Sequence, residues 1–470
     1  MLRFAPVVGM STSTLDIRDQ CRQAARAARN LLLFRDVVDD PIGRAHIAVI
    51  DALAKDDREQ ARTHFSELFY QLAKTVELGE ASPGDALQQH LLDRILLDDN
   101  PFSQKCEQAG PAAVGPALHE AARQDLTALH QLFALSGGII SNAISKQIVQ
   151  TTLNPHAPSI DASTLPALRE LAPLRLAAAA TDSNIRRCFE QTVDWSMLVE
   201  QLADLFNSRG AGQLARYRAF RWIGSNPRDD HPLQPVVDID PIRLTDLIGY
   251  DVEREIVIKN TEYFLAGQVA NNVLLYGDRG TGKSSTVKAL LNEYSERGLR
   301  LVEVPKSHLS ELSSLLTLLR GRRERFIIFV DDLSFDDNET HYRDLKAILE
   351  GGIEARPANV LLYATSNRRH IVSERFSDRG RPGDEIHAFD TVQEKLSFSD
   401  RFGISVTFSA PDQDRYLQIV DGLAAARNLP ISHANLHRRA LEWETWQNGR
   451  SARTARQFID FLTGEFHQSG

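Results

Sequence analysis

The spacing of apolar residues predicts helices in the first half of the chain. Between residues 15 and 222, apolar side chains recur at helical intervals and strand-like runs are scarce. The clearest stripe occupies positions i, i+3, i+4, i+7 and i+11 of one helix face, and consists of Phe65, Leu68, Phe69, Leu72 and Val76. Further helices are predicted over residues 16–34, 85–97, 116–135, 165–180 and 185–208. We therefore expect an all-helical N-terminal domain over residues 1–223.

The pattern changes in the second half. Three prolines within residues 224–235 predict an extended linker, because proline is excluded from helix interiors and central strands. After it, short β-rich runs alternate with amphipathic helical stretches, and the predicted strands cover residues 273–276, 301–304, 326–330, 360–364 and 404–408. Such alternation is typical of a mostly parallel sheet with helices on both faces. We place this α/β core at residues 236–410, and the helical pattern of residues 411–470 predicts a small C-terminal lid.

Composition and charge narrow the functional classes. At about 150 residues per domain, the 470-residue chain corresponds to about three structural units. Its 54 Lys and Arg against 63 Asp and Glu give a net charge of −9. No overall positive field therefore attracts the protein to nucleic acid or anionic lipid, and any such binding needs a local patch.

The cysteines and the apolar runs indicate in which cellular compartment the protein is expected. The 3 cysteines lie far apart in the sequence, which disfavours a disulfide framework or a Cys-based zinc site. No apolar stretch reaches the roughly 18 residues of a membrane span, and the N-terminal residues lack a signal-peptide pattern. We expect a soluble, cytoplasmic protein with no membrane partner.

The clearest chemical motif is a glycine-rich loop. Residues 277–284 match G-x-x-x-x-G-K-[ST] between a predicted strand and a predicted helix. Its glycines permit backbone torsions that turn N–H groups toward phosphate oxygens. We expect Lys283 to contact the β and γ phosphates of a nucleotide and Ser284 to bind Mg²⁺, at the positive end of the helix dipole. The nucleotide-binding residues predicted from this loop are Gly277, Asp278, Arg279, Gly280, Thr281, Gly282, Lys283, Ser284 and Ser285.

A P-loop of this kind also needs an acidic group at the end of a neighbouring buried strand. The apolar run 326–330 leads directly to Asp331 and Asp332. Alone, such a pair is typical of a solvated cap on a core strand. Beside the P-loop, we expect Asp331 on the Mg²⁺ side and Asp332 to polarise an attacking water.

With these motifs in place, the chain from about residue 236 to the C-terminus resembles the AAA+ ATPases. Residues 246–250 are similar to the segment that packs against adenine in that superfamily, which implicates Ile248 and Gly249 in nucleotide binding. Residues 361–367 are similar to the strand that ends in the first sensor, here Asn367. The resemblance implies that Asn367 helps to orient the water near the γ phosphate.

Two arginine-containing segments extend the resemblance. Residues 396–403 resemble the arginine-finger segment, in which a guanidinium, here that of Arg401, reaches the γ phosphate held by an adjacent subunit. Residues 449–458 resemble the second-sensor helix of the lid, with Arg453 as first choice and Arg456, about one turn later, as second.

A narrower resemblance is to a bacterial group of AAA+-like ATP-binding proteins known only by a domain-of-unknown-function label. It is carried by residues 331–335, 342–346, 349–352, 364–370 and 394–403. One departure from the usual AAA+ pattern is that Asp332 stands where most members carry Glu. A side chain one methylene shorter holds a water differently, which bears on hydrolysis more than on nucleotide binding.

The resemblance implies an ATPase that uses Mg²⁺ and hydrolyses ATP to ADP and phosphate. It also implies a homo-oligomer, completed by Arg401 in trans, that couples nucleotide state to the N-terminal helices and to an unknown protein client. A nucleotide-dependent switch or scaffold with negligible hydrolysis is the main alternative, and Asp332 is its only sequence support. A P-loop kinase explains the loop but gives no role to Asn367, Arg401 and the lid arginines together.

Three weaker features have two readings each. Residues 216–222 interleave arginines with aromatic residues, which is typical of a single-strand nucleic-acid platform or of a terminal helix with Tyr217 and Phe220 on one face; the net charge favours the helix. His433 and His437 are four residues apart but lack the Glu of a zinc-protease helix, which disfavours a zinc site. The charged segment 373–385 is interpreted as a solvated loop rather than a partner-contacting element.

Overall fold

The chain forms two compact units, Met1–Arg216 and Tyr217–Gly470, each described here by itself. The structure of the protein is a computed structural model. This structure describes residues 16–76, 80–81, 85–149, 165, 168, 171, 174–175, 182–224, 232–333, 345, 349, 356–367, 401–447 and 449–468. Across those residues, every helix is too short or too polar to cross a lipid bilayer.

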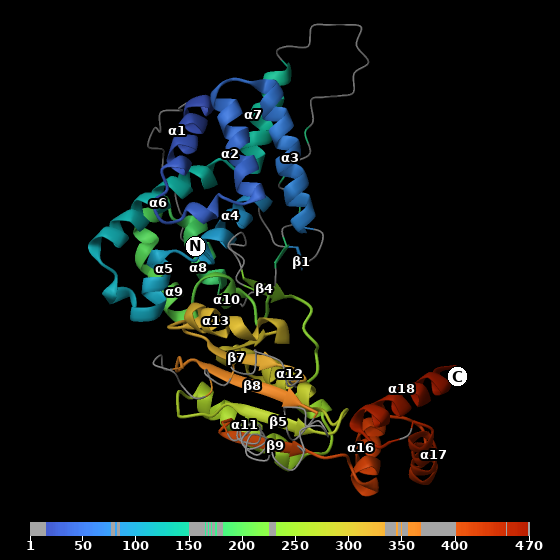
Figure 1. Ribbon diagram of the computed structural model, residues 1–470. Helices are drawn as coiled ribbons and strands as arrows, with labels where there is room; N and C mark the ends of the chain where they lie inside the picture. The colour runs from blue at the N-terminus through green and yellow to red at the C-terminus, as the bar shows by residue number, and fades with distance from the viewer. Residues whose placement is uncertain are drawn as a thin grey trace, which may run out of the picture. The chain divides into compact units, whose positions relative to one another are not determined.

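The first unit is built from helices, as the apolar pattern predicts (Figure 1). Its α-helices are α1 (Ile17–Arg29), α2 (Pro41–Ala54), α3 (Arg58–Val76), α4 (Ala86–Leu96), α5 (Pro101–Ala109), α6 (Pro116–Ala134), α7 (Gly137–Val149), α8 (Asp182–Gln191), α9 (Val199–Arg209) and α10 (Gly212–Arg216). Short 3-10 turns are η1 (Arg35–Val37), η2 (Pro111–Ala113) and η4 (Trp195–Leu198), and β1 (Glu80–Ala81) pairs with β2 (Leu174–Arg175). The helix expected over residues 165–180 is therefore wrong at β2, and most of its other residues lie outside the described part.

The helices begin at capping residues that the sequence places before them. Asp85 accepts hydrogen bonds from the Leu87 and Gln88 amides at the start of α4, and Asn100 forms a capping box with Ser103 at the start of α5. Pro101 occupies the first helical position of α5, where a missing N–H costs nothing. Local sequence thus determines where these helices start.

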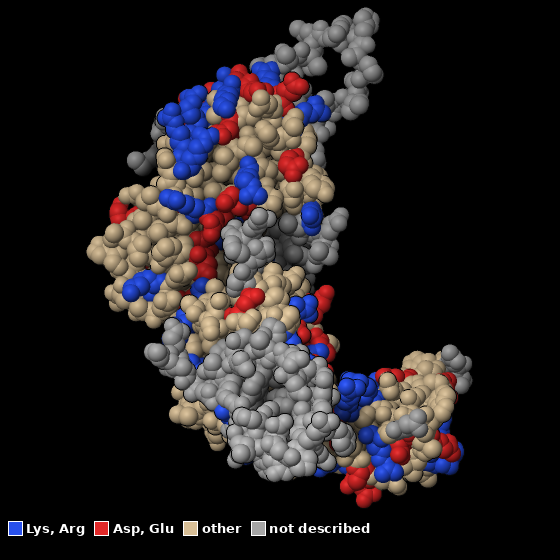
Figure 2. All heavy atoms as spheres, viewed as in Figure 1, with Lys and Arg blue, Asp and Glu red and all other residues tan. Residues whose placement is uncertain are grey.

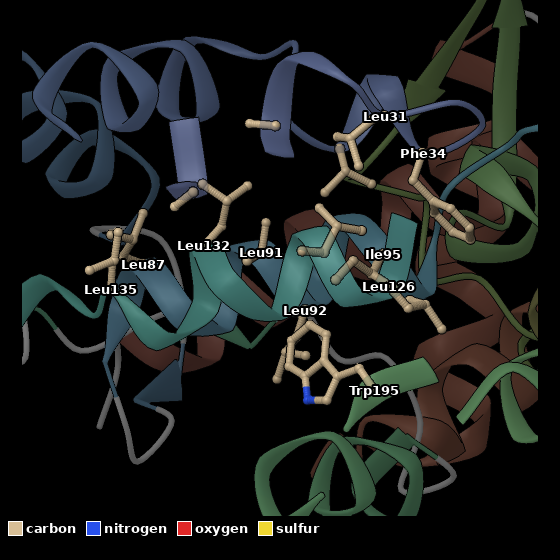
Figure 3. Close-up of a cluster of buried hydrophobic side chains, with 14 of the residues drawn as sticks. Leu31, Phe34, Leu87, Leu91, Leu92, Ile95, Leu126, Leu132, Leu135 and Trp195 are labelled. Carbon is tan, nitrogen blue, oxygen red and sulfur yellow. The ribbon is translucent and has the colours of Figure 1, made fainter. Parts of the chain in front are cut away.

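The apolar stripes of the helices meet in one core. Phe65, Leu68 and Leu72 on α3 are buried, as their spacing predicts. Figure 3 shows leucines of α4 and α6 facing one another, with Trp195 of η4 below them. The Trp195 indole N–H is satisfied by the Phe189 carbonyl oxygen at 2.8 Å.

A buried carboxylate fixes the turn between α1 and η1. Asp125 on α6 is 2% exposed. Its oxygens accept hydrogen bonds from the backbone N–H groups of Leu32, Leu33 and Phe34, at 2.7 to 3.0 Å. These amides have no helical partner, so Asp125 supplies the acceptors that water would otherwise provide.

Basic side chains gather over α1, as Figure 2 shows for the first unit. They are spaced so as to share a helix face, at Arg18, Arg22, Arg26 and Arg29. Three of these arginines face aspartates: Arg18 with Asp56, Arg22 with Asp19 and Arg29 with Asp51. The patch is therefore largely neutralised.

The second unit contains a 7-stranded sheet in the order β4-β3-β6-β7-β8-β5-β9. Its strands are β3 (Ala219–Trp222), β4 (Leu233–Val236), β5 (Val273–Gly277), β6 (Leu299–Glu303), β7 (Arg325–Val330), β8 (Val360–Ser366) and β9 (Ile404–Phe408). All neighbouring pairs are parallel except β3 with β4. The five predicted strands are confirmed, and so is the α/β fold class with a mostly parallel sheet flanked by helices.

Helices cover both faces of the sheet. They are α11 (Asp251–Leu265), α12 (Lys283–Tyr294) and α13 (Leu312–Leu319), with the 3-10 turns η5 (Leu244–Asp246), η6 (Ser295–Arg297) and η7 (Lys306–Glu311). Along β7, Ile327 and Phe329 join the core formed with α11 and α12. Ile328 points the other way and lines a small cavity with Leu312 and Leu316 of α13. The continuous apolar run of β7 thus serves two buried faces.

The junction between the units differs from the sequence prediction. Residues 219–222 form β3 rather than the end of a helix, because Phe220 and Trp222 are buried while Arg221 is exposed. Linker residues 233–236 form the antiparallel edge strand β4, where Pro235 is tolerated since an edge strand needs fewer N–H donors. The arginine–aromatic alternation is therefore strand periodicity, and the second unit begins at Tyr217 rather than after residue 223.

The C-terminal lid consists of α16 (Gln413–Ala426), α17 (His433–Trp446) and α18 (Ala452–Gln468). Tyr416, Ile419 and Val420 of α16, Leu436 of α17 and Phe458 of α18 are buried in the same core as the face of the sheet covered by α11 and α12. The lid is thus packed on the core of its unit. The expected loop 373–385 lies outside the described residues.

We predict that Asp125→Ala lowers the free energy of unfolding by about 3 kcal/mol, because buried backbone N–H groups lose their acceptor. The matched control is Glu120→Ala, on the exposed face of the same helix, for which we expect a change within about 0.5 kcal/mol. Urea unfolding of the full chain, followed by tryptophan fluorescence, measures both. Equal midpoints for the two variants would contradict the role of Asp125.

Candidate functional site

The glycine-rich loop joins strand β5, which lies between β8 and β9, to α12. β5 ends at Gly277 and α12 begins at Lys283, so the loop amides and the free N–H groups of the helix face the same space. Gly277 and Gly280 have φ angles of 134° and 76°, in the region that side chains disfavour. The loop conformation therefore depends on glycine at these positions.

Strand β9 anchors the loop. A Cβ added to Gly277 would lie 2.1 Å from the Phe408 carbonyl oxygen. That oxygen accepts a hydrogen bond from the Asp278 backbone N–H at 3.0 Å. The Asp278 carboxylate in turn accepts one from the Ala410 N–H at 2.6 Å. These two hydrogen bonds hold β9 close to the loop and leave no room for a side chain on Gly277.

Lys283 is held inside the loop. Its Nζ donates to the carbonyl oxygens of Gly277 and Asp278, at 3.0 and 2.6 Å, and to Oδ1 of Asn367 at 3.2 Å. Burial lowers the pKa of Lys283, while the carboxylates of Asp278, Asp332 and Asp331 act in the opposite direction. The ammonium is thus positioned at the carboxyl ends of both β5 and β8.

Asp331 lies beside the helix start. Its Oδ1 accepts hydrogen bonds from Ser284 Oγ at 2.6 Å and from Thr365 Oγ1 at 2.5 Å. The Thr365 Oγ1 also accepts the Asp332 backbone N–H at 2.8 Å. Thr365 was not predicted as a site residue. Its position two residues before Asn367 at the end of a buried strand is the signal that could have found it.

Asp332 is oriented by its backbone and by Asn367. Its φ of 52° lies in the left-handed region, which Asp adopts more readily than most residues. Asn367 Nδ2 donates to Asp332 Oδ1 at 2.5 Å. Because its Oδ1 accepts from Lys283, the Asn367 amide links the cation of the loop to the carboxylate after β7.

These side chains line one pocket of about 600 Å³. Among the predicted residues, its wall includes Arg279, Gly280, Thr281, Gly282, Lys283, Ser284, Ser285, Asp331, Asp332, Asn367, Arg453 and Arg456. The lid arginines come from α18, whose start packs on the loop: the Arg453 N–H donates to the Gly280 carbonyl oxygen at 3.1 Å. The pocket thus combines guanidinium and ammonium groups with two carboxylates.

The segment expected to contact adenine borders a smaller, adjoining pocket. Ile248 lines this space of about 30 Å³, together with Thr281 and Arg456, which also line the larger pocket. On the lid side, Ile248 packs so closely on α16 that a Cβ on Gly422 would lie 2.6 Å from it. Gly249 likewise faces Ile419 of α16. This space has room for water but not for a nucleobase in the conformation described.

Arg401 does not line either pocket. It precedes β9, whose first residue Ile404 pairs with Val273 at the start of β5, whereas Phe408 pairs with Gly277 at the end. Arg401 therefore lies toward the opposite edge of the sheet from the loop. The fold therefore separates Arg401 from Lys283, Asp331 and Asn367.

The second unit matches a protein family. The family described as "Protein of unknown function (DUF815)" matches residues 215–466, more than half of the chain. No curated protein matches.

Solved structures superpose only loosely. RuvB from Thermotoga maritima, named as a Holliday junction branch migration motor, is 16% identical over 47% of this chain and 72% of that chain, with a TM-score of 0.29. AMPPCP-bound DnaA from Aquifex aeolicus is 14% identical over 48% of this chain and 65% of that chain, with a TM-score of 0.34. Likeness at this level carries no argument about activity.

We predict that Gly277→Ala abolishes nucleotide binding, because the new Cβ would clash with the Phe408 carbonyl oxygen and displace the loop. The matched control is Gly298→Ala, which also has a positive φ, of 88°, but would meet no atom within 4 Å. Titration with a fluorescent ATP analogue measures binding, and circular dichroism checks the fold. If the folded Gly277→Ala protein bound the analogue normally, nucleotide binding would not depend on the close approach of Phe408 to Gly277.

Proposed function

The chain belongs to the DUF815 family of proteins of unknown function, and we propose that it binds ATP with Mg²⁺ and hydrolyses the β–γ bond. One observation carries the proposal. Asp331 and Asn367, which follow the ends of β7 and β8, meet Lys283, the first residue of α12 after the loop that follows β5. Ligands of α/β sheets bind at this edge.

The loop is suited to a triphosphate. Its amides and the first turn of α12 offer N–H donors with the positive end of the helix dipole. Lys283 now donates to two loop carbonyls, and phosphate oxygens would be stronger, charged acceptors for the same ammonium. Arg453 and Arg456 add positive charge from the lid side of the pocket.

The donor set at the helix start fits Mg²⁺. Ser284 Oγ and Asp331 Oδ1 lie 2.6 Å apart and are both hard oxygen donors. Ser284 would bind the ion directly and Asp331 would hold it through water. When bound, the ion neutralises charge on the β and γ phosphates.

Asp332 is the proposed general base. It would accept a proton from the water that attacks the γ phosphorus, while the bridging oxygen leaves with ADP. Asn367 orients Asp332 through the 2.5 Å hydrogen bond, and the same amide contacts Lys283 at 3.2 Å. Asn367 would therefore hold the lysine that contacts the phosphates and the carboxylate that acts as the base at a fixed distance from each other.

Self-assembly is part of the proposal. Because Arg401 lies away from its own pocket, a catalytic role requires the pocket of a neighbouring subunit. A homo-oligomer would therefore hydrolyse ATP faster than a monomer. Lid movement would transmit nucleotide state to the N-terminal helices and to a protein client.

A nucleotide-operated switch with negligible hydrolysis is the second candidate. It is favoured by Asp332, whose carboxylate is one methylene shorter than the usual Glu and is already hydrogen-bonded to Asn367. Turnover that stays negligible at every protein concentration, with ATP binding intact, would favour the switch.

We expect Lys283→Ala to abolish ATP binding, because Lys283 is the only lysine among the described residues that line the pocket. Without it, the phosphates would lose their ammonium partner. Lys288→Ala, on the exposed side of the same helix, is the matched control and should bind ATP normally. Isothermal titration calorimetry measures binding. Wild-type affinity in Lys283→Ala would overturn the assignment of the phosphate site.

Arg401→Ala should keep ATP affinity but lose the rise in specific activity that accompanies assembly. Phosphate release measured across a range of protein concentrations tests this. A concentration-dependent rise identical to that of wild type would exclude Arg401 as a finger acting in trans.

Asp332→Asn should retain ATP binding and lower turnover by about 10²-fold or more, the usual contribution of a general base. Single-turnover phosphate release measures the chemical step. The trapped, ATP-bound variant is also the best form with which to recover a client from native cells. Unchanged turnover would show that Asp332 is not the base.

A further inference from the structure

The lid contains a group of three potential metal ligands far from the P-loop in sequence. Asp421 lies on α16, and His433 and His437 lie one turn apart on α17. His437 Nε2 is 2.8 and 2.9 Å from the two carboxylate oxygens of Asp421. His433 Nε2 is 3.1 Å from Asp421 Oδ2.

The two imidazoles converge on the same carboxylate. Their ring centroids are only 3.8 Å apart. One donor atom from each of the three residues lies within 4.8 Å of the others. His437 is mostly covered, with 23% of its side chain exposed, while His433 is 72% exposed, so one side of the group is open to solvent.

We propose that Asp421, His433 and His437 bind a divalent transition-metal ion, with Zn²⁺ as the representative. Two imidazole nitrogens and one carboxylate oxygen suit Zn²⁺, Co²⁺ or Ni²⁺ better than Mg²⁺ or Ca²⁺. Ligands at 2.0–2.1 Å in a tetrahedron lie about 3.3 Å from one another. The separations of 2.8–3.1 Å between each imidazole Nε2 and the Asp421 carboxylate need only a small outward adjustment to admit the ion, and all three donor atoms lie within 4.8 Å of one another.

The third ligand explains why the sequence disfavoured such a site. The spacing of His433 and His437 lacks the Glu of a zinc-protease helix, and that argument concerns catalytic zinc. Asp421 comes from the preceding helix, and only the packing of α16 on α17 brings it to the histidines. The solvent-open side leaves the remaining coordination position to water.

A metal at this place would tie α16 to α17. α16 also carries Ile419 and Gly422, which pack on Gly249 and Ile248 beside the small pocket. The ion would therefore stiffen the lid helix that has to move when a base enters that pocket. The metal site itself stands independently of ATP hydrolysis.

The test uses the full-length, untagged protein, freed of metal with a chelator and titrated with ZnCl₂ by calorimetry. Wild type should bind one equivalent of Zn²⁺ per chain at this site. Asp421→Asn and His437→Ala should each weaken that binding by at least about tenfold, since loss of supporting groups alone costs about 10- to 100-fold. His467→Ala, an exposed histidine on α18, is the matched control and should bind as wild type does.

Two further readouts separate ligation from a folding defect. Co²⁺ should give visible absorption bands with wild type that are absent with Asp421→Asn. Zn²⁺ should raise the melting temperature of wild type, while the metal-free proteins melt alike. Zn²⁺ affinity and Co²⁺ spectra that are the same in Asp421→Asn as in wild type would overturn the proposal, as would the absence of stoichiometric binding by wild type.

Discussion

Parallel pairing of β5 between β8 and β9 is the constraint on which the second unit depends. The register sets Tyr276 beside Ser366 and Gly277 beside Phe408, so the loop after β5 emerges next to the ends of both neighbours. On the other side of β8, Val330 pairs with Ala364, which brings Asp331 next to Thr365. A slip of one residue would turn every side chain of the slipped strand to the opposite face and remove these contacts.

The pocket keeps opposite charges close without joining them directly. Asn367 stands between Lys283 and Asp332, accepting from one and donating to the other. Only a side-chain amide, or a group with both functions, can do this while remaining neutral. The lysine cation and the carboxylate are therefore held in position without forming an ion pair of their own, and both stay directed at the same pocket.

The lid touches the site at two places with different consequences. The backbone N–H of Arg453 is hydrogen-bonded to the Gly280 carbonyl oxygen, which positions the start of α18 beside the glycine-rich loop. α16 instead fills the space beside Ile248, where about 30 Å³ remains. The larger pocket beside the loop is thus open in the conformation described, whereas the smaller pocket beside Ile248 is nearly filled by α16. If the proposed ATP binding is correct, lid position and nucleotide binding would be coupled through this helix.

The sequence by itself determined most of the helices and strands, and it predicts the chemistry of the loop. Periodicity predicted the helical first unit and five of the seven strands of the sheet. Residue types within 277–284 and at Asp331 predict phosphate and metal chemistry at that place. These signals are local, because helix and strand periods and the glycine torsions are properties of neighbouring residues. The same local reasoning failed at 219–222, where alternation over four residues was too short to separate a strand from a helix end.

Only the tertiary structure decided which distant groups meet. Thr365 became part of the site through the register of β8 with β7, and Arg401 was separated from it by the direction of β9. Asp421 joined His433 and His437 through the packing of two helices. These relations join residues far apart in the chain, and their geometry is set by strand pairing and side-chain packing, which no local pattern in a single sequence encodes.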